Sequence, residues 1–128
     1  MIHGIGTDIV AVARIVEFHR KFGERALEKV LAPDERDACR AALEPARFLA
    51  KRFAAKEAFA KALGTGVRTP VLLPAIAVTH DALGKPAFEF SDALADYMSE
   101  RGLTAHLSLS DEKDNVIAFV VVEQPGQP

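Results

Sequence analysis

The amino-acid sequence predicts an α+β fold: a compact single domain in which a mostly antiparallel sheet packs on a long central helix. Three observations lead to this prediction. One helical segment is apolar nearly all round, which is typical of a buried helix. Strand patterns occur at the start of the chain, as a central hairpin and as two runs near the end. Strands and helices also mix without the strict alternation of parallel α/β proteins.

The length of 128 residues suits one domain rather than two, and no linker or internal repeat divides the chain. We expect the domain to span residues 1–123 and residues 124–128, Gln-Pro-Gly-Gln-Pro, to form a flexible tail. A domain of this length needs neither disulfides nor a structural metal to be stable.

The first ten residues are predicted to form a strand with two unlike faces. One face carries Ile5, Thr7 and Ile9, and the other carries Gly4, Gly6 and Asp8. Because glycine weakens a strand, we expect the two glycines to admit another backbone or a ligand. Asp8 therefore lies near the end of a strand, beside a face without side chains.

Two helices are predicted before the central one. The first spans residues 12–22, and its buried-type stripe is Val12, Ile15, Val16, His19 and Phe22. A second stripe along it carries Arg14, Phe18 and Lys21, followed by Arg25. The second helix begins at Pro33 with two acids in its first turn and ends near Leu43, before Pro45.

The central helix is predicted over residues 46–63, with Gly64 at the position that commonly ends a helix. The elements expected after it are a strand at 75–80, a turn at 84–86, its partner strand at 87–90, a helix capped by Ser91 and running to Arg101, a strand at 105–110, a turn at 111–115 and a buried or central strand at 116–123.

The composition excludes several classes of function. The 16 basic residues do not exceed the 18 acidic ones, which argues against a nucleic-acid binder that works through bulk charge. Cys39 is alone, which excludes an internal disulfide or a cysteine cluster. The longest apolar run, Val116–Val122, is far shorter than the roughly 20 residues that cross a bilayer. With no signal-peptide pattern either, we expect a cytoplasmic protein that does not bind membranes.

The central helix carries the residues with the clearest chemistry. Glu57 and Lys61 are four positions apart and share a helix face beside a stripe of alanines. They could form an ordinary solvated ion pair. Alternatively, Glu57 and the strand-end Asp8 supply two carboxylates, which suffice for Mg²⁺ when substrate phosphates and water provide its other ligands. Lys61 would then donate to those phosphates.

Two neighbouring features are less specific. Arg52 and Lys56 are also four apart but of like sign, so they form either a solvent-facing basic edge or a pair that holds an anion. The Gly64-Thr65-Gly66 turn is not followed by the Lys-Ser/Thr of a phosphate-binding P-loop, and it can simply end the helix.

Two separated blocks together carry a family resemblance. Gly-Ile-Gly-Thr-Asp-Ile-Val at 4–10 and Arg-Phe-Ala-Ala-Lys-Glu-Ala-Phe-Ala-Lys-Ala-Leu-Gly-Thr-Gly at 52–66 resemble the signature blocks of the holo-acyl-carrier-protein synthases. These form the short, bacterial branch of the 4′-phosphopantetheinyl transferases. The resemblance extends over nearly the whole chain and includes the Gly-Lys-Pro turn at 84–86 and the His-Leu-Ser-Leu-Ser strand at 106–110.

The resemblance implies an enzyme of fatty acid biosynthesis. Such enzymes use Mg²⁺ to move the 4′-phosphopantetheine arm of coenzyme A onto a serine of an apo acyl carrier protein, and they release adenosine 3′,5′-bisphosphate. It implies that Asp8 and Glu57 bind the metal and that Lys61 contacts phosphate. Glu57 would take the serine proton directly or through a water. Family members form homotrimers whose active sites lie between subunits.

The resemblance also implies binding residues. Those expected along coenzyme A are Arg52, Lys56, Gly64, Gly66, Lys85, Pro86 and His106. His106 could instead be an ordinary half-buried strand histidine. Arg14, Lys21 and Arg25 around an exposed Phe18 would dock the acidic carrier protein, although the same stripe could be a plain solvated face.

One position departs from the family. Many relatives carry Ser-His where this chain has Ser110-Asp111, so no role can rest on a second histidine there. Two alternative functions stay open on the residues alone: a module that binds a nucleotide or carrier protein without chemistry, and a metal-dependent hydrolase of pyrophosphate bonds.

Overall fold

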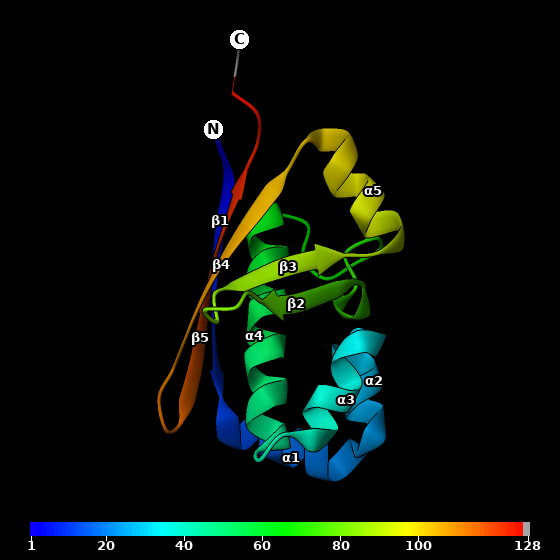
Figure 1. The fold of residues 1–128 in the computed structure, drawn as a ribbon, viewed down its shortest axis with the longest axis vertical. Coiled ribbons are helices and arrows are strands. Elements are labelled where there is room, and N and C mark those ends of the chain that lie inside the picture. Colours follow the sequence, from blue (N-terminus) through cyan, green and yellow to red (C-terminus); the bar gives the residue numbers. More distant parts are fainter. Residues whose placement is uncertain (127–128) are drawn as a thin grey trace.

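The computed structural model describes residues 1–126, and one long helix, α4, runs through the middle of the molecule (Figure 1). The elements in chain order are β1 (Ile2–Ala11), α1 (Val12–Phe22), α2 (Glu24–Val30), α3 (Pro33–Ala41), α4 (Pro45–Leu63), the short 3₁₀ turn η1 (Leu73–Ala75), β2 (Ile76–His80), β3 (Pro86–Phe90), α5 (Asp92–Arg101), β4 (Thr104–Asp111) and β5 (Asn115–Glu123). The predicted α+β class is confirmed. Across residues 1–126, none of the helices combines the length and apolar character that crossing a membrane requires.

The main sheet has three antiparallel strands in the order β1-β5-β4, and β2 and β3 form a separate hairpin. The strand predicted at 116–123 is therefore central, as expected. The covered face of the sheet includes Asp8, which pairs with Ala118, and Leu109, which pairs with the same residue from the other side. Burial of Ala118 shows that this face lies against α4.

The glycines of β1 allow the helix to approach the sheet backbone to backbone. A methyl group added at Gly4 would lie 1.9 Å from the carbonyl oxygen of Ala62, and one at Gly6 would lie 2.1 Å from that of Ala58. Only glycine fits at both positions, because no side chain tolerates such contacts. The expectation that these glycines admit another backbone is confirmed.

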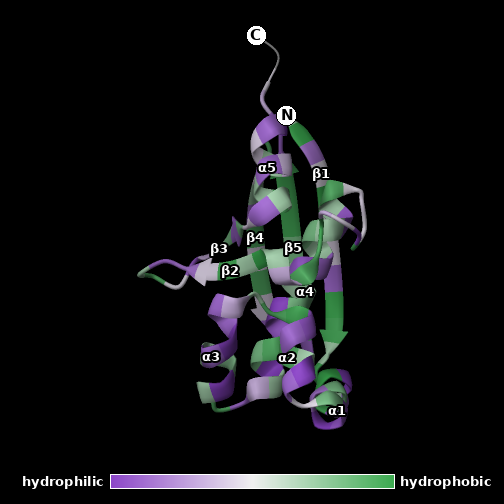
Figure 2. Ribbon diagram, turned by 90° about the vertical axis from the view of Figure 1, so that its right-hand side faces the viewer, coloured by the Kyte–Doolittle hydropathy of each residue, from purple (hydrophilic) through white to green (hydrophobic). Residues whose placement is uncertain are grey.

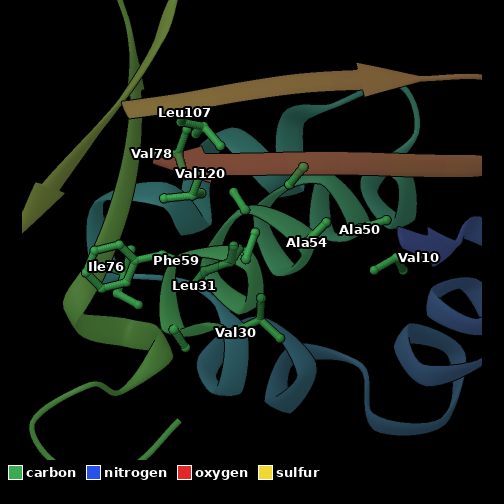
Figure 3. Close-up of a cluster of buried hydrophobic side chains, with 14 of the residues drawn as sticks. Val10, Val30, Leu31, Ala50, Ala54, Phe59, Ile76, Val78, Leu107 and Val120 are labelled. Carbon is green, nitrogen blue, oxygen red and sulfur yellow. The ribbon is translucent and has the colours of Figure 1, made fainter. Parts of the chain in front are cut away.

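The side of α4 away from the sheet completes the core. Phe59 packs against Phe88 and Phe90 of β3, with ring centroids 5.3 and 4.9 Å apart. Figure 3 shows Phe59 beside Ile76 of β2, with Leu31 close by. The hairpin thus crosses α4 and holds it against the sheet (Figure 1).

The outer face of the sheet is apolar and uncovered. Ile5 and Ile9 of β1 are 60% and 63% exposed, and Ile117 and Phe119 of β5 are each 44% exposed. Exposed and buried side chains therefore alternate along β5, and most of both kinds are apolar, so the strand is largely green in Figure 2. Large exposed apolar patches usually mark contacts with another molecule.

Several details differ from the sequence expectations. The helix α2 was not predicted, because it has seven residues and follows α1 after one glycine, Gly23, whose φ is 56°. Val16 was placed in the buried stripe of α1 but is 47% exposed, since α1 buries only Ile15. The second helix also ends at Ala41 rather than near residue 43.

Two further details, one at the start of α5 and one at the end of the sheet, differ from expectation. Ser91 precedes α5 but its side chain makes no capping hydrogen bond. The backbone of Gln124 exchanges hydrogen bonds with Met1, so this residue is held at the end of the sheet rather than frayed. The rest of the expected tail includes residues 127–128, which lie outside the described residues.

Candidate active site

The close approach of α4 to β1 brings Lys61 to Asp8. The Lys61 ammonium lies 3.0 Å from Asp8 Oδ1 and donates a second hydrogen bond, also 3.0 Å long, to the carbonyl oxygen of Thr7. The Asp8 side chain is 16% exposed and that of Lys61 is 54% exposed. The Lys61 ammonium is therefore open to solvent, while the Asp8 carboxylate is mostly covered.

Glu57 lies one helical turn before Lys61 and is half-buried. Burial raises the pKa of its carboxyl, the negative charge of Asp8 raises it further, and Lys61 partly opposes both effects. Two carboxylates from distant parts of the chain are thus close enough to repel each other. Such a pair is stabilised by a cation placed between its members.

The donor set fits Mg²⁺ better than a metal held by protein alone. Among residues 1–126 no group of three or more His, Cys, Asp or Glu side chains could hold a metal ion. Two carboxylates are enough for Mg²⁺, which usually keeps several waters and takes phosphate oxygens from its substrate. Asp8 and Glu57 therefore suit a Mg²⁺ ion that arrives with a phosphate-bearing ligand.

Lys56 does not occupy the position expected for a phosphate contact. It is completely buried, and its ammonium lies 2.6 Å from Glu35 Oε1, 2.6 Å from the Val30 carbonyl oxygen and 3.1 Å from that of Leu73. Burial lowers the pKa of Lys56 to about 8, although the adjacent Glu35 opposes this shift. With all three donors used inside the protein, the expectation that Lys56 binds coenzyme A is wrong for this structure.

Arg52 is also committed to the interior. Its side chain is 12% exposed and donates to Glu35 Oε2 at 2.9 Å and to the Val78 carbonyl oxygen. The guanidinium carbon lies 4.4 Å from the centre of the Phe48 ring. Arg52 and Lys56 are therefore not a solvent-facing basic edge, because the anion between them is the Glu35 carboxylate.

The turn after α4 ends the helix, as its sequence allows. Gly64 and Gly66 have φ of 86° and 68°, and the Gly64 amide donates to the carbonyl oxygens of Ala60 and Lys61. No heavy atom lies within 4 Å of where a side chain would start at either glycine. The turn is therefore open, directly beyond Lys61.

His106 is not brought to Asp8 within one chain. Lys85 is exposed in the β2–β3 turn, and Pro86 begins β3. His106 pairs across the sheet with Val121, which pairs with Ile5, so it lies on the outer face. Its ring Nε2 lies 2.5 Å from Glu123 Oε1. Asp8 lies on the covered face and on the opposite edge strand.

The basic side chains expected to dock a carrier protein are exposed, but the aromatic one is not. Arg14, Lys21 and Arg25 reach solvent. Phe18 is half-buried and packs on Phe22, with ring centroids 5.2 Å apart. The expected exposed apolar centre is therefore smaller than the sequence suggested, because Phe18 turns toward the core.

The sequence does not predict the contacts of two charged groups. Glu35 is buried, with 4% of its surface exposed. It accepts hydrogen bonds from Lys56, Arg52 and the backbone amides of Ala32 and Val78. The Asp111 carboxylate accepts a hydrogen bond of 3.1 Å from the Arg47 guanidinium and lies 3.6 Å from the Lys51 ammonium. No local pattern marks these ion pairs, because each basic partner is at least 17 residues away along the chain.

Comparison with known proteins decides the family. The model of the 4′-phosphopantetheinyl transferase superfamily matches residues 4–120. The chain belongs to this superfamily. The match includes both β1 and α4, the two elements that bring Asp8, Glu57 and Lys61 together.

Individual superfamily members are similar over almost their full length. The holo-[acyl-carrier-protein] synthase of Azoarcus sp. (strain BH72) is 62% identical over 96% of this chain and 98% of its own. The crystal structure of the Neisseria meningitidis holo-[acyl-carrier-protein] synthase superposes with a TM-score of 0.93 at 50% identity, covering 97% of this chain and 100% of that one. A Bacillus anthracis holo-(acyl-carrier-protein) synthase solved in complex with CoA (3′,5′-ADP) gives a TM-score of 0.82 at 36% identity, covering 98% and 99%.

Proposed function

We propose that this protein transfers the 4′-phosphopantetheine arm of coenzyme A to a serine of an apo acyl carrier protein and releases adenosine 3′,5′-bisphosphate. The observation that carries the proposal is the convergence of Asp8, Glu57 and Lys61 where α4 lies on β1. Transfer of a phosphoryl-type group asks mainly for positioning and neutralisation of charge, which two carboxylates with a metal and one lysine can supply. The relatives named above carry this activity in their names.

Asp8 and Glu57 would hold Mg²⁺. The bound ion would neutralise the diphosphate of coenzyme A and make its phosphorus more electrophilic. Lys61 would hold the same diphosphate from the exposed side, using donors that now bind Asp8 and Thr7. The raised pKa of Glu57 is consistent with this assignment, because burial raises it most and the negative charge of Asp8 raises it further.

Glu57 would also accept the proton that the serine hydroxyl loses, directly or through a water. A carboxylate bound to Mg²⁺ would be a poor base, so the route through a water is favoured. Its helix is held on both sides, so the carboxylate keeps its place beside Asp8.

The remaining expected contacts call for a second copy of the chain. His106 and Asp8 lie on opposite faces and opposite edges of the sheet, so one coenzyme A could reach both only across an interface. The uncovered apolar face formed by Ile5, Ile9, Ile117 and Phe119 suits such an interface. We propose a homotrimer, the number being that of the family, with Lys85, Pro86 and His106 on one subunit and Gly64 and Gly66 on its neighbour lining the cofactor.

The first helix would dock the carrier protein. Arg14, Lys21 and Arg25 supply positive charge for an acidic partner, and charge steers association even where it adds little affinity. The exposed Val16 adds apolar area on the same helix.

One experiment tests the proposed function. The protein is incubated with coenzyme A, Mg²⁺ and an apo acyl carrier protein, and the carrier is weighed by mass spectrometry. A gain of one phosphopantetheine, dependent on Mg²⁺, is expected. Cleavage of coenzyme A without modification of the carrier would indicate a hydrolase, and binding without either product would indicate a module; both outcomes contradict the proposal.

A further inference from the structure

A fully satisfied buried ion pair lies directly beside Glu57 in the chain. Lys56 has 0% exposure, and its three donors reach three elements: α2 through Val30, α3 through Glu35 and η1 through Leu73. An ammonium has three protons, so no donor is left over.

The carboxylate partner is bonded just as completely. Glu35 Oε1 accepts from Lys56 and from the Ala32 amide at 2.8 Å. Glu35 Oε2 accepts from Arg52 at 2.9 Å and from the Val78 amide at 3.0 Å. Through these bonds the pair joins α3 and α4 to β2, and it contacts the ends of α2 and η1.

Stability alone gives this arrangement no clear advantage. A buried ion pair costs desolvation and is often no more stabilising than apolar side chains of the same volume. What the pair supplies is direction, since each hydrogen bond fixes an angle as well as a distance. An apolar replacement would fill the space without fixing either.

Directional contacts matter on this side of α4, because the side that packs on the glycines of β1 carries small side chains. Against β1 the helix presents Ala58 and Ala62 to two glycines, so small atoms meet backbone there. Residues two positions apart on a helix point in nearly opposite directions, so Lys56 lies away from that contact. The three bonds of Lys56 therefore oppose rotation of α4 about its own axis.

We propose that Lys56 and Glu35 are positioning residues for Glu57: their buried bonds fix the rotation of α4 and thereby hold the Glu57 carboxylate toward Asp8. Glu57 is the next residue after Lys56, so any rotation that relaxes the Lys56 bonds moves Glu57 directly. A displacement of about 1 Å in an active site can cost about 100-fold in rate. This inference rests on the proposed role of Asp8 and Glu57 as a shared cation site.

The test measures cation binding in the full-length protein. Mn²⁺ replaces Mg²⁺ as a paramagnetic probe, and free Mn²⁺ is titrated by electron paramagnetic resonance in the presence of coenzyme A without carrier protein. Lys56→Met keeps the volume and leaves Glu35 paired with Arg52. Glu35→Gln keeps the shape and removes one charge, and it decides the question if Lys56→Met does not fold. Met98→Ala, a buried change in α5, is the control for lost stability.

The Kd of Mn²⁺ should rise about tenfold or more in Lys56→Met and less in Glu35→Gln, about the lower end of what losing a direct hydrogen-bond partner of a metal ligand costs, because these residues act on Glu57 only through the helix. Met98→Ala should bind Mn²⁺ with the wild-type Kd, even if its thermal unfolding temperature falls as far as that of Lys56→Met or Glu35→Gln. An unchanged Kd in the folded Lys56 or Glu35 variants, or an equal rise in Met98→Ala, would overturn the inference alone. A wild type that binds no Mn²⁺ would instead overturn the proposed cation site and this inference with it.

Discussion

Lys61 lies 3.0 Å from Asp8 although 53 residues separate them in the chain. The contact exists because Gly4 and Gly6 let α4 lie on the backbone of β1. One of the best-marked sequence features, a strand interrupted by glycines, is thus the physical cause of the active-site geometry.

Gly6→Ala should destabilise the protein by about 1–3 kcal/mol or more, the usual cost of forcing extra atoms into a packed contact. The new methyl group would lie 2.1 Å from the carbonyl oxygen of Ala58, a backbone atom that cannot turn aside. Urea unfolding measures the change. Gly126→Ala is the matched control, because nothing lies within 4 Å of its added atom. Equal stability of both variants would show that α4 does not press on β1.

Glu57→Gln should lower the rate of transfer by about 100-fold or more, because it removes a metal ligand and the proposed base together. The dependence of rate on Mg²⁺ concentration should shift to higher values. Glu100→Gln, an exposed change in α5, should leave both quantities unchanged. Transfer by Glu57→Gln at the wild-type rate and Mg²⁺ requirement would remove Glu57 from the site.

Arg14→Glu should raise the KM for the carrier protein about tenfold and leave the KM for coenzyme A unchanged, since reversing a steering charge slows association with an acidic partner. Arg20→Glu is the control on the same helix, because Arg20 already pairs with Glu17 and lies outside the proposed stripe. Steady-state kinetics with each substrate varied in turn separates the two constants. A carrier KM that is equal in Arg14→Glu and the wild type would contradict docking on this face.

Mixing two inactive variants should restore activity if sites form between subunits. Lys61→Ala and His106→Ala each damage one side of the shared site, and co-refolded equimolar mixtures should regain about a quarter of wild-type activity, the share of sites whose two sides are both intact. Each variant refolded alone is the control. No recovery in mixtures that sedimentation shows to be assembled would place Lys61 and His106 in separate functions.

The stability of the fold should fall in acid partly through Glu35. Burial alone would raise the pKa of this carboxyl, but the charge of Lys56 and the hydrogen bonds to it outweigh burial, so its pKa lies below the ordinary value of 4.5. A carboxyl with a lowered folded-state pKa contributes stability above its unfolded pKa, and this is lost as the pH falls through the folded value. Glu35→Gln should therefore flatten the decline of the unfolding free energy below pH 4.5. A slope equal to that of the wild type would contradict the lowered pKa.

Local patterns predicted much of the fold and part of the site. The glycine-marked strand, the buried helix ended by Gly64 and the hairpin all follow from residues close together in the chain, and they placed Asp8, Glu57 and Lys61. The interior role of Lys56 did not follow, because its partner Glu35 is 21 residues away and nothing local marks a carboxylate that will be buried. The same limit hid the half-buried packing of Phe18, which depends on where α1 meets the core.

The most direct measurement is a crystal structure of the protein with coenzyme A and Mn²⁺, in which anomalous scattering locates the cation. We expect one Mn²⁺ bound by carboxylate oxygens of both Asp8 and Glu57 and by a phosphate oxygen of coenzyme A, with Lys61 on the same diphosphate. A cation bound elsewhere, or these two carboxylates too far apart to share it even across subunits, would contradict the account.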